Sequence, residues 1–179
     1  MDFKIVIGIV VLVVLIWGIC ISNKFNKLNV KIDEAESGID VALEKRYDVL
    51  TKMIDTVKGY AKHEKETLLE VIAFRKGMTM EEKNKAYAQM DEALGKINVL
   101  VENYPDLKAS QNFLKLQASI TDVEEHLQAA RRLYNANVSA LNQAIVVFPG
   151  SIIAKFKGTT KREFFKAESY KKNDIKIEF

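Results

Sequence analysis

The hydrophobic pattern begins with seventeen consecutive apolar residues, Ile5 to Ile21, without a charge, a proline or an amide. As a helix this run rises about 25 Å, close to the hydrocarbon thickness of a bilayer, and a helix satisfies its own backbone in lipid. We therefore predict a transmembrane anchor with the lipid bilayer as its partner. Residues spaced along the predicted span are Ile5, Val10, Leu15, Trp17 and Ile21.

Two other interpretations of this run are disfavoured by its C-terminal end. A cleaved secretory signal has a shorter apolar core and small residues at its exit, but this run ends in the segment Cys20–Lys24. A lipoprotein cysteine at Cys20 is disfavoured by the bulky Ile19 before it.

Lysines beside the span predict its orientation. Lys24, Lys27 and Lys31 follow it closely, whereas Lys4 before it is balanced by Asp2. Basic residues favour the cytoplasmic side, so we expect a single-pass protein with its N-terminus outside and its C-terminal domain in the cytoplasm.

Beyond the span, apolar residues recur at steps of three and four, which is typical of a bundled or coiled helix. No proline falls between Met1 and Tyr104. We predict one unbroken helix from the membrane to about residue 76, ended by Gly77 as a left-handed residue. The apolar stripe continues through Tyr47, Leu50, Ile54, Val57, Ala61, Leu68 and Val71.

Two further long helices are predicted. Thr79 and Glu82 have the spacing of a capping box at the start of the second, which stops before Tyr104-Pro105. The third starts near Ser110 and ends at Phe148-Pro149-Gly150. The fold class is therefore all-α, an N-terminal transmembrane helix continuing into an elongated antiparallel bundle of three long helices.

Short elements are predicted after the third helix. Residues 151–156 and 163–166 are expected to form helical turns, and residues 175–179 a short strand or an extended end. The five apolar residues Ile152, Ile153, Phe156, Phe164 and Phe165 are expected to fold back over the end of the third helix. The predicted domains are the anchor (1–22), the bundle (23–150) and a basic tail (151–179).

Helix lengths lead to a prediction of self-association. If the second helix returns toward the membrane and the third climbs again, the second is too short to cover the membrane-proximal part of the first. An exposed apolar seam is stable when a second copy packs on it, so we predict a homo-oligomer. The alternative is that a lower loop or a bend hides the seam within the chain. The seam residues are Phe25, Leu28, Ile32, Ala35, Ile39 and Leu43.

The cysteine and histidine content disfavours several kinds of functional site. The single cysteine lies in the span, so neither a disulfide framework nor a thiolate metal site is expected. His63 and His126 are the two histidines, and neither has the spacing of a zinc protease or a di-iron bundle. We predict no metal, no cofactor and no enzymatic activity.

Polar residues beside the apolar stripes predict a buried network. Such a row either binds a ligand or, more often, fixes the register between helices. Arg46 lies close to the seam, and we expect it to pair with a carboxylate from a neighbouring helix. The predicted structural polar network comprises Arg46, Asp48, Glu124, Gln128, Arg131, Tyr134 and Asn135.

The C-terminal segment is basic, with eight Lys/Arg against four Asp/Glu in residues 151–179, while the whole chain has a net charge of +3. Its basic residues alternate with aromatic ones, which suits anionic lipid or RNA. The mixed acids favour a solvated surface instead, and no nucleic acid is expected. Anionic lipid is the alternative partner of this tail.

Short segments in a specific order extend along nearly the whole chain, among them residues 45–48 (KRYD), 57–64 (VKGYAKHE) and 104–109 (YPDLKA). Together these segments resemble the LemA family. One departure is Thr51, where many members have proline, which removes a reason for a bend there. The matching segments are residues 45–48 (KRYD), 57–64 (VKGYAKHE), 104–109 (YPDLKA), Asn112-Phe113 with Leu116-Gln117, Ala130-Arg131-Arg132 with Tyr134-Asn135, and Phe148-Pro149. The resemblance implies a bacterial membrane protein with one N-terminal span and an elongated helical bundle, without an established activity or cofactor.

The sequence thus favours a single-pass bacterial membrane protein that serves as a non-enzymatic, self-associating helical scaffold or interaction protein. The alternative is a ligand-binding or anionic-lipid-binding module of the envelope.

Overall fold

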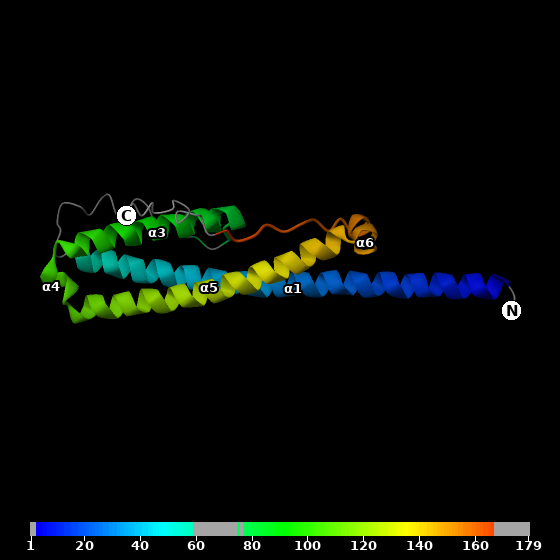
Figure 1. Ribbon diagram of the computed structural model, residues 1–179, viewed down its shortest axis with the longest axis horizontal. Helices are drawn as coiled ribbons and strands as arrows, with labels where there is room; N and C mark the ends of the chain where they lie inside the picture. The colour runs from blue at the N-terminus through cyan, green and yellow to red at the C-terminus, as the bar shows by residue number, and fades with distance from the viewer. Residues whose placement is uncertain (1–2, 59–74, 76, 167–179) are drawn as a thin grey trace, which may run out of the picture. The chain divides into compact units, whose positions relative to one another are not determined.

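The computed structural model describes residues 3–58, 75 and 77–166. All the regular structure in these residues is helical, so the predicted all-α class is confirmed. The helices are α1 (Phe3–Lys58), α3 (Met80–Glu102), α4 (Pro105–Lys108), α5 (Gln111–Val146) and α6 (Gly150–Lys157). Figure 1 shows them along the chain.

α1 carries the predicted span. Its apolar part has a mean hydropathy of 3.1, and none of that part is buried in the described structure. The helix continues past the span to Lys58 without a break. Its predicted end near residue 76 lies outside the described residues, as do His63, Leu68 and Val71, whereas Gly77 has the expected left-handed conformation, with φ of 84°.

The ends of α3 and α5 follow the local sequence signals. The Thr79 side chain accepts a hydrogen bond from the Glu82 amide, and the Glu82 carboxylate accepts one from the Thr79 amide, so the predicted capping box is present. α3 ends before Tyr104, and Pro105 occupies the first turn of α4, where its missing N–H is tolerated.

The segment after α5 differs in part from the prediction. α6 provides the expected helical turns and ends at Gly158, whose φ is 64°. Residues 163–166, however, form neither helix nor turn, so the second predicted helical turn is wrong. The reason is that side chains of the long helices bind this backbone: Tyr134 donates to the Glu163 carbonyl, and Asn84 accepts from the Lys166 amide.

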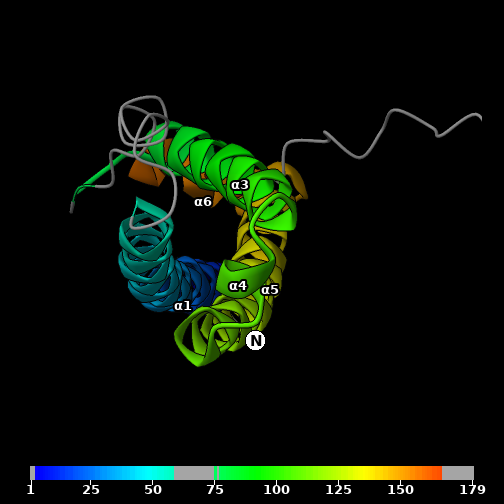
Figure 2. The same ribbon diagram turned by 90° about the vertical axis from the view of Figure 1, so that its left-hand side faces the viewer.

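The chain divides into two compact units. Unit 1 comprises Met1–Ser37 and Ala130–Phe164, and unit 2 comprises Gly38–Ala129 and Phe165–Phe179. α1 and α5 each contribute one part to each unit. The core of unit 2 lies between α1, α3, α4 and α5, and Figure 2 shows α1, α3 and α5 in a view along the helices. Its buried members include Leu50, Met53, Ile54, Met90, Ile97, Leu107, Phe113 and Ile120.

Contacts within each unit fix the directions of the helices. In unit 2, α3 runs parallel to α1, because Asp40 pairs with Lys83 and Arg46 with Asp91. In unit 1, α5 runs antiparallel to α1, since Asn137 donates to the Lys31 carbonyl while the later Gly150 lies near the earlier Phe25. The predicted course, with the second helix returning and the third climbing away from the membrane, is therefore wrong (Figure 1).

This correction removes the exposed seam. α5 runs back along the part of α1 in unit 1, and the stripe residues of both units are covered within the single chain. Ile32, Ile39 and Leu43 are completely buried, Phe25 and Ala35 are nearly so, and Leu28 is half-buried. The prediction that Phe25, Leu28, Ile32, Ala35, Ile39 and Leu43 form a seam left open for a second copy is wrong.

Candidate functional site

The most enclosed charge in the described chain is Arg46, which is 1% exposed. It projects from the part of α1 in unit 2. One guanidinium nitrogen lies 3.0 Å from Asp91 Oδ1 on α3, and another lies 3.2 Å from Glu124 Oε2 on α5. Arg46 therefore joins three helices through two ion pairs.

Tyr87 of α3 completes the surroundings of Arg46. The guanidinium carbon lies 4.5 Å from the centre of the Tyr87 ring, which is the arrangement of a cation–π contact. The Tyr87 hydroxyl donates a hydrogen bond of 3.1 Å to Glu124 Oε1, and the Gln128 amide donates one of 2.9 Å to the same oxygen. Burial and the Glu124 carboxylate raise the pKa of Tyr87, so the phenol stays protonated and serves as a donor.

A second buried cation, Lys83, lies on α3 one turn before Tyr87. Lys83 is 3% exposed and its ammonium lies 2.7 Å from Asp40 Oδ1 of α1. Together with the Arg46 pairs, this contact fixes the register of α1 against α3. The cluster therefore holds the helices together, because its charged groups form ion pairs with one another.

The structure places the predicted polar network in separate parts of the chain. Arg46, Glu124 and Gln128 meet in unit 2, while Asp48 is exposed on α1. Arg131, Tyr134 and Asn135 belong to the part of α5 in unit 1. Sequence reasoning missed Asp91, Lys83, Asp40 and Tyr87 as members of this cluster. The sequence contains one indication that these residues are near the core. Each lies next to an apolar residue of its helix stripe or one turn from it.

The polar contacts of unit 1 hold the segment after α6 against α1 and α5. Asn142 accepts from the Arg162 amide and donates to the Arg162 carbonyl, both at 2.9 Å. The Arg162 guanidinium lies 2.7 Å from Asp33 Oδ1 and 3.4 Å from Glu36 Oε2. Tyr134 donates to the Glu163 carbonyl at 2.9 Å, and burial, with the nearby Glu36 carboxylate, raises the pKa of Tyr134 to about 12.

Alkaline pH is expected to weaken unit 1 through Tyr134. A phenol whose pKa is about 10 in the unfolded chain and about 12 in the folded chain stabilises the fold below pH 10, and this contribution is lost as the pH rises to 12. Tyr134→Phe should lower the free energy of unfolding at pH 8 by about 1 kcal/mol, because the hydrogen bond is lost. The difference from wild type should shrink between pH 10 and 12 in urea unfolding of the detergent-solubilised chain. A difference that is constant with pH would contradict this assignment.

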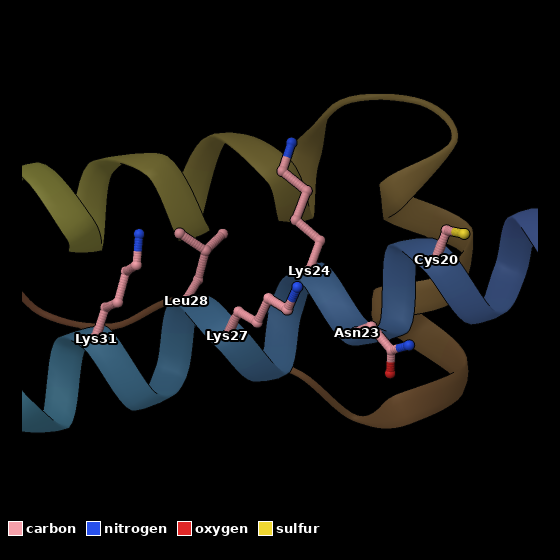
Figure 3. A pocket seen from close by; sticks show the side chains of 6 residues that line it. All are labelled: Cys20, Asn23, Lys24, Lys27, Leu28 and Lys31. Atoms are coloured by element: carbon pink, nitrogen blue, oxygen red, sulfur yellow. The ribbon is translucent and has the colours of Figure 1, made fainter.

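The membrane end of unit 1 gathers basic side chains. Lys157 of α6 donates to Ser22 Oγ at 3.0 Å and to Asn26 Oδ1 at 2.7 Å, both on α1 just after the span. An open hollow on another face of α1 is shown in Figure 3. Its lining residues are Cys20, Asn23, Lys24, Lys27, Leu28 and Lys31.

In the described part of the chain, no group of three His, Cys, Asp or Glu side chains is placed to hold a metal ion. His126 lies 3.6 Å from Asp122 on the exposed face of α5. His63 and Glu64 are outside the described residues.

Comparison with known proteins identifies relatives of this chain. The sequence profile of the LemA family matches residues 35–179. Protein LemA of Metamycoplasma hominis is 30% identical over 150 residues, which cover 81% of this chain and 68% of that protein. Magnetosome protein MamQ of Magnetospirillum gryphiswaldense is 29% identical over 73 residues, covering 41% of this chain and 27% of MamQ. MamQ 2 of Paramagnetospirillum magneticum matches to the same extent, and none of these names states an enzymatic activity.

Proposed function

Because the chain belongs to the LemA family, we propose that it is a bacterial membrane-anchored helical scaffold that acts by contact with other proteins rather than by catalysis. The main support is α1, a single helix that begins as an exposed apolar span and continues as a core helix of the bundle. The lysines after the span favour the cytoplasmic side for the bundle.

The buried charges support a role without catalysis. Arg46 pairs with Glu124, the Tyr87 hydroxyl donates to the same carboxylate group, and Lys83 pairs with Asp40. A catalytic group needs access to a substrate, whereas the two cations, Arg46 and Lys83, are almost completely buried. A ligand site along the polar row of the third helix is the weaker alternative, since Glu124 is already bonded to Tyr87 and Gln128.

Contact surfaces for other proteins are available outside the span. Val99 of α3 is 67% exposed and Leu133 of α5 is 58% exposed, although both are large apolar side chains on bundle helices. Self-association stays a prediction. If it occurs, it uses a surface other than the covered stripe of α1.

Site-specific photo-crosslinking in intact cells tests this proposal. A photoreactive amino acid at Val99, and separately at Leu133, should give adducts of discrete mass with the full chain in the membrane. The matched control is Ile97, which is completely buried two residues from Val99 and should crosslink only within the chain. An adduct of twice the chain mass would identify a second copy as the partner, and other discrete masses a different protein. A complete lack of adducts at both exposed positions would contradict the scaffold.

A further inference from the structure

We propose that α6 and the residues just before it form a second membrane contact, which inserts apolar side chains into the bilayer surface and binds anionic phospholipid headgroups with nearby lysines. This interaction surface goes beyond the scaffold function, because it does not depend on any protein partner. All of its parts belong to unit 1.

The position of α6 along α1 places it at the edge of the bilayer. A Cβ on Gly18, which belongs to the predicted span, would lie 3.6 Å from Ile153 Cδ1. Lys157 is bonded to Ser22 and Asn26, which follow the span. α6 therefore lies beside the stretch of α1 from Gly18 to Asn26, about 12 Å of helix that includes the last turn of the span and the first turn after it.

The orientation of α6 suits an interfacial helix. α6 is bent by 97° from α5, and α5 runs antiparallel to α1 in this unit. The axis of α6 consequently runs across the direction of α1, and Figure 1 shows α6 beside α1 at the end of α5. Since transmembrane helices are tilted by only about 20° on average from the bilayer normal, a helix that crosses the span lies near the membrane plane.

Gly150 makes this bend possible. A Cβ at Gly150 would overlap the carbonyl oxygen of Ala144 and lie 3.5 Å from Phe25 Cζ. Only glycine allows the start of α6 to approach the end of α5 and the side of α1 so closely. The placement of α6 is thus built into the fold.

Exposed apolar side chains cover the surface of this element. Phe156 is 87% exposed and Phe148 is 73% exposed, which corrects the expectation that Phe156 folds back over the third helix. Ile152 and Phe156 are four residues apart and share one face of α6. The exposed apolar residues here are Val146, Val147, Phe148, Ile152 and Phe156. Such a patch is costly in water, and because α6 lies beside the end of the span, the bilayer is the occupant that it fits.

The charges around the patch match an anionic lipid surface. Residues 22–31 and 143–161 contain no Asp or Glu. Their lysines are exposed in the structure: Lys24, Lys27 and Lys31 on α1, and Lys155, Lys157 and Lys161 on or just after α6. Each lysine near an anionic membrane contributes about 1 kcal/mol to the attraction.

The depth of Phe156 in the bilayer tests the apolar part of the proposal. The full chain, carrying Cys20→Ser and a nitroxide on Phe156→Cys, is reconstituted in vesicles that contain phosphatidylglycerol. We expect the label to collide more with dissolved oxygen than with a water-soluble nickel chelate, as a label within the lipid does. The control label on Val99→Cys should show the opposite preference. A second label on Ile152→Cys guards against local disruption by the first.

Two outcomes would overturn the apolar contact. Labels at both α6 positions that are as accessible to nickel as the Val99 label would place α6 in water. Labels that are protected from both oxygen and nickel would show that a protein surface covers α6 instead of lipid.

Lipid selectivity tests the charged part. Spin-labelled phosphatidylglycerol should be retained at the surface of the full wild-type chain in preference to spin-labelled phosphatidylcholine. Lys155→Gln with Lys161→Gln should reduce this preference by about fivefold for each lysine, the equivalent of about 1 kcal/mol. The matched control is Lys85→Gln with Lys96→Gln, two exposed lysines of α3, which should leave it unchanged. Equal loss in both variants, or loss in neither, would overturn the headgroup contact. Neither result would bear on the crosslinks that test the scaffold.

Discussion

Arg46→Ala is expected to lower the free energy of unfolding by about 3–5 kcal/mol, one of the two largest effects for a single substitution in this chain. Arg46 is 1% exposed and is the common partner of Asp91 and Glu124. Its removal leaves Glu124 without its cation among three helices, and the Tyr87 ring without the group that covers it. Urea unfolding of the detergent-solubilised chain, followed by circular dichroism, measures the loss.

A double-mutant cycle with Glu124→Gln separates the ion pair from packing. If the two groups interact, Glu124→Gln should destabilise the wild type more than it destabilises the Arg46→Ala variant. Lys96→Ala, a change to an exposed lysine of α3, is the control and should shift stability by less than about 0.5 kcal/mol. If Arg46→Ala lowers the free energy of unfolding by less than about 1 kcal/mol, Arg46 does not hold the three helices together.

Ile32→Glu is the second substitution with a large expected effect. Ile32 is completely buried within the single chain, so a carboxylate there is either desolvated or forces unit 1 to open. We expect a loss of at least about 4 kcal/mol. Val30→Glu is a matched control two residues away on an exposed face, since Val30 is 57% exposed.

The same pair of variants distinguishes a folded core from an interface between copies. If the stripe on α1 served a second copy, Ile32→Glu would reduce the particle mass in detergent and leave the helical content of the single chain intact. If the chain covers its own stripe, Ile32→Glu lowers the unfolding midpoint and Val30→Glu leaves it nearly unchanged. Particle mass and thermal unfolding by circular dichroism, measured on the same samples, decide between these results.

Local signals predicted the helices well because their causes lie within a few residues. The capping box at Thr79, the stop before Pro105 and the helix end near Pro149-Gly150 each depend on neighbouring backbone groups. The apolar run from Ile5 to Ile21 is similarly local. The LemA resemblance, confirmed by the match over residues 35–179, rests on such segments in their order.

The errors concern contacts between distant residues. Apolar periodicity shows which face of a helix is buried, but it is the same whichever way the next helix runs, so it could not show that α3 is parallel to α1. The partners of Arg46 depend on the register of α1 against α3 and α5, which no single stretch encodes. Phe165 and Phe156 look alike in the sequence, yet Phe165 packs edge-on against Tyr87 with ring centres 5.9 Å apart, whereas Phe156 is exposed.

Unit 1 is assembled from the beginning of the chain and from its last third, and this order matters during synthesis. Ala35 leaves the ribosome well before Ala130, and at about 5–20 residues per second the interval between them is roughly 5–20 s. Through that time the apolar face of α1 next to the membrane has no cover from its own chain. The nascent chain is therefore most accessible to chaperones, neighbouring chains and proteases at the same stretch of α1 that is buried once translation is complete.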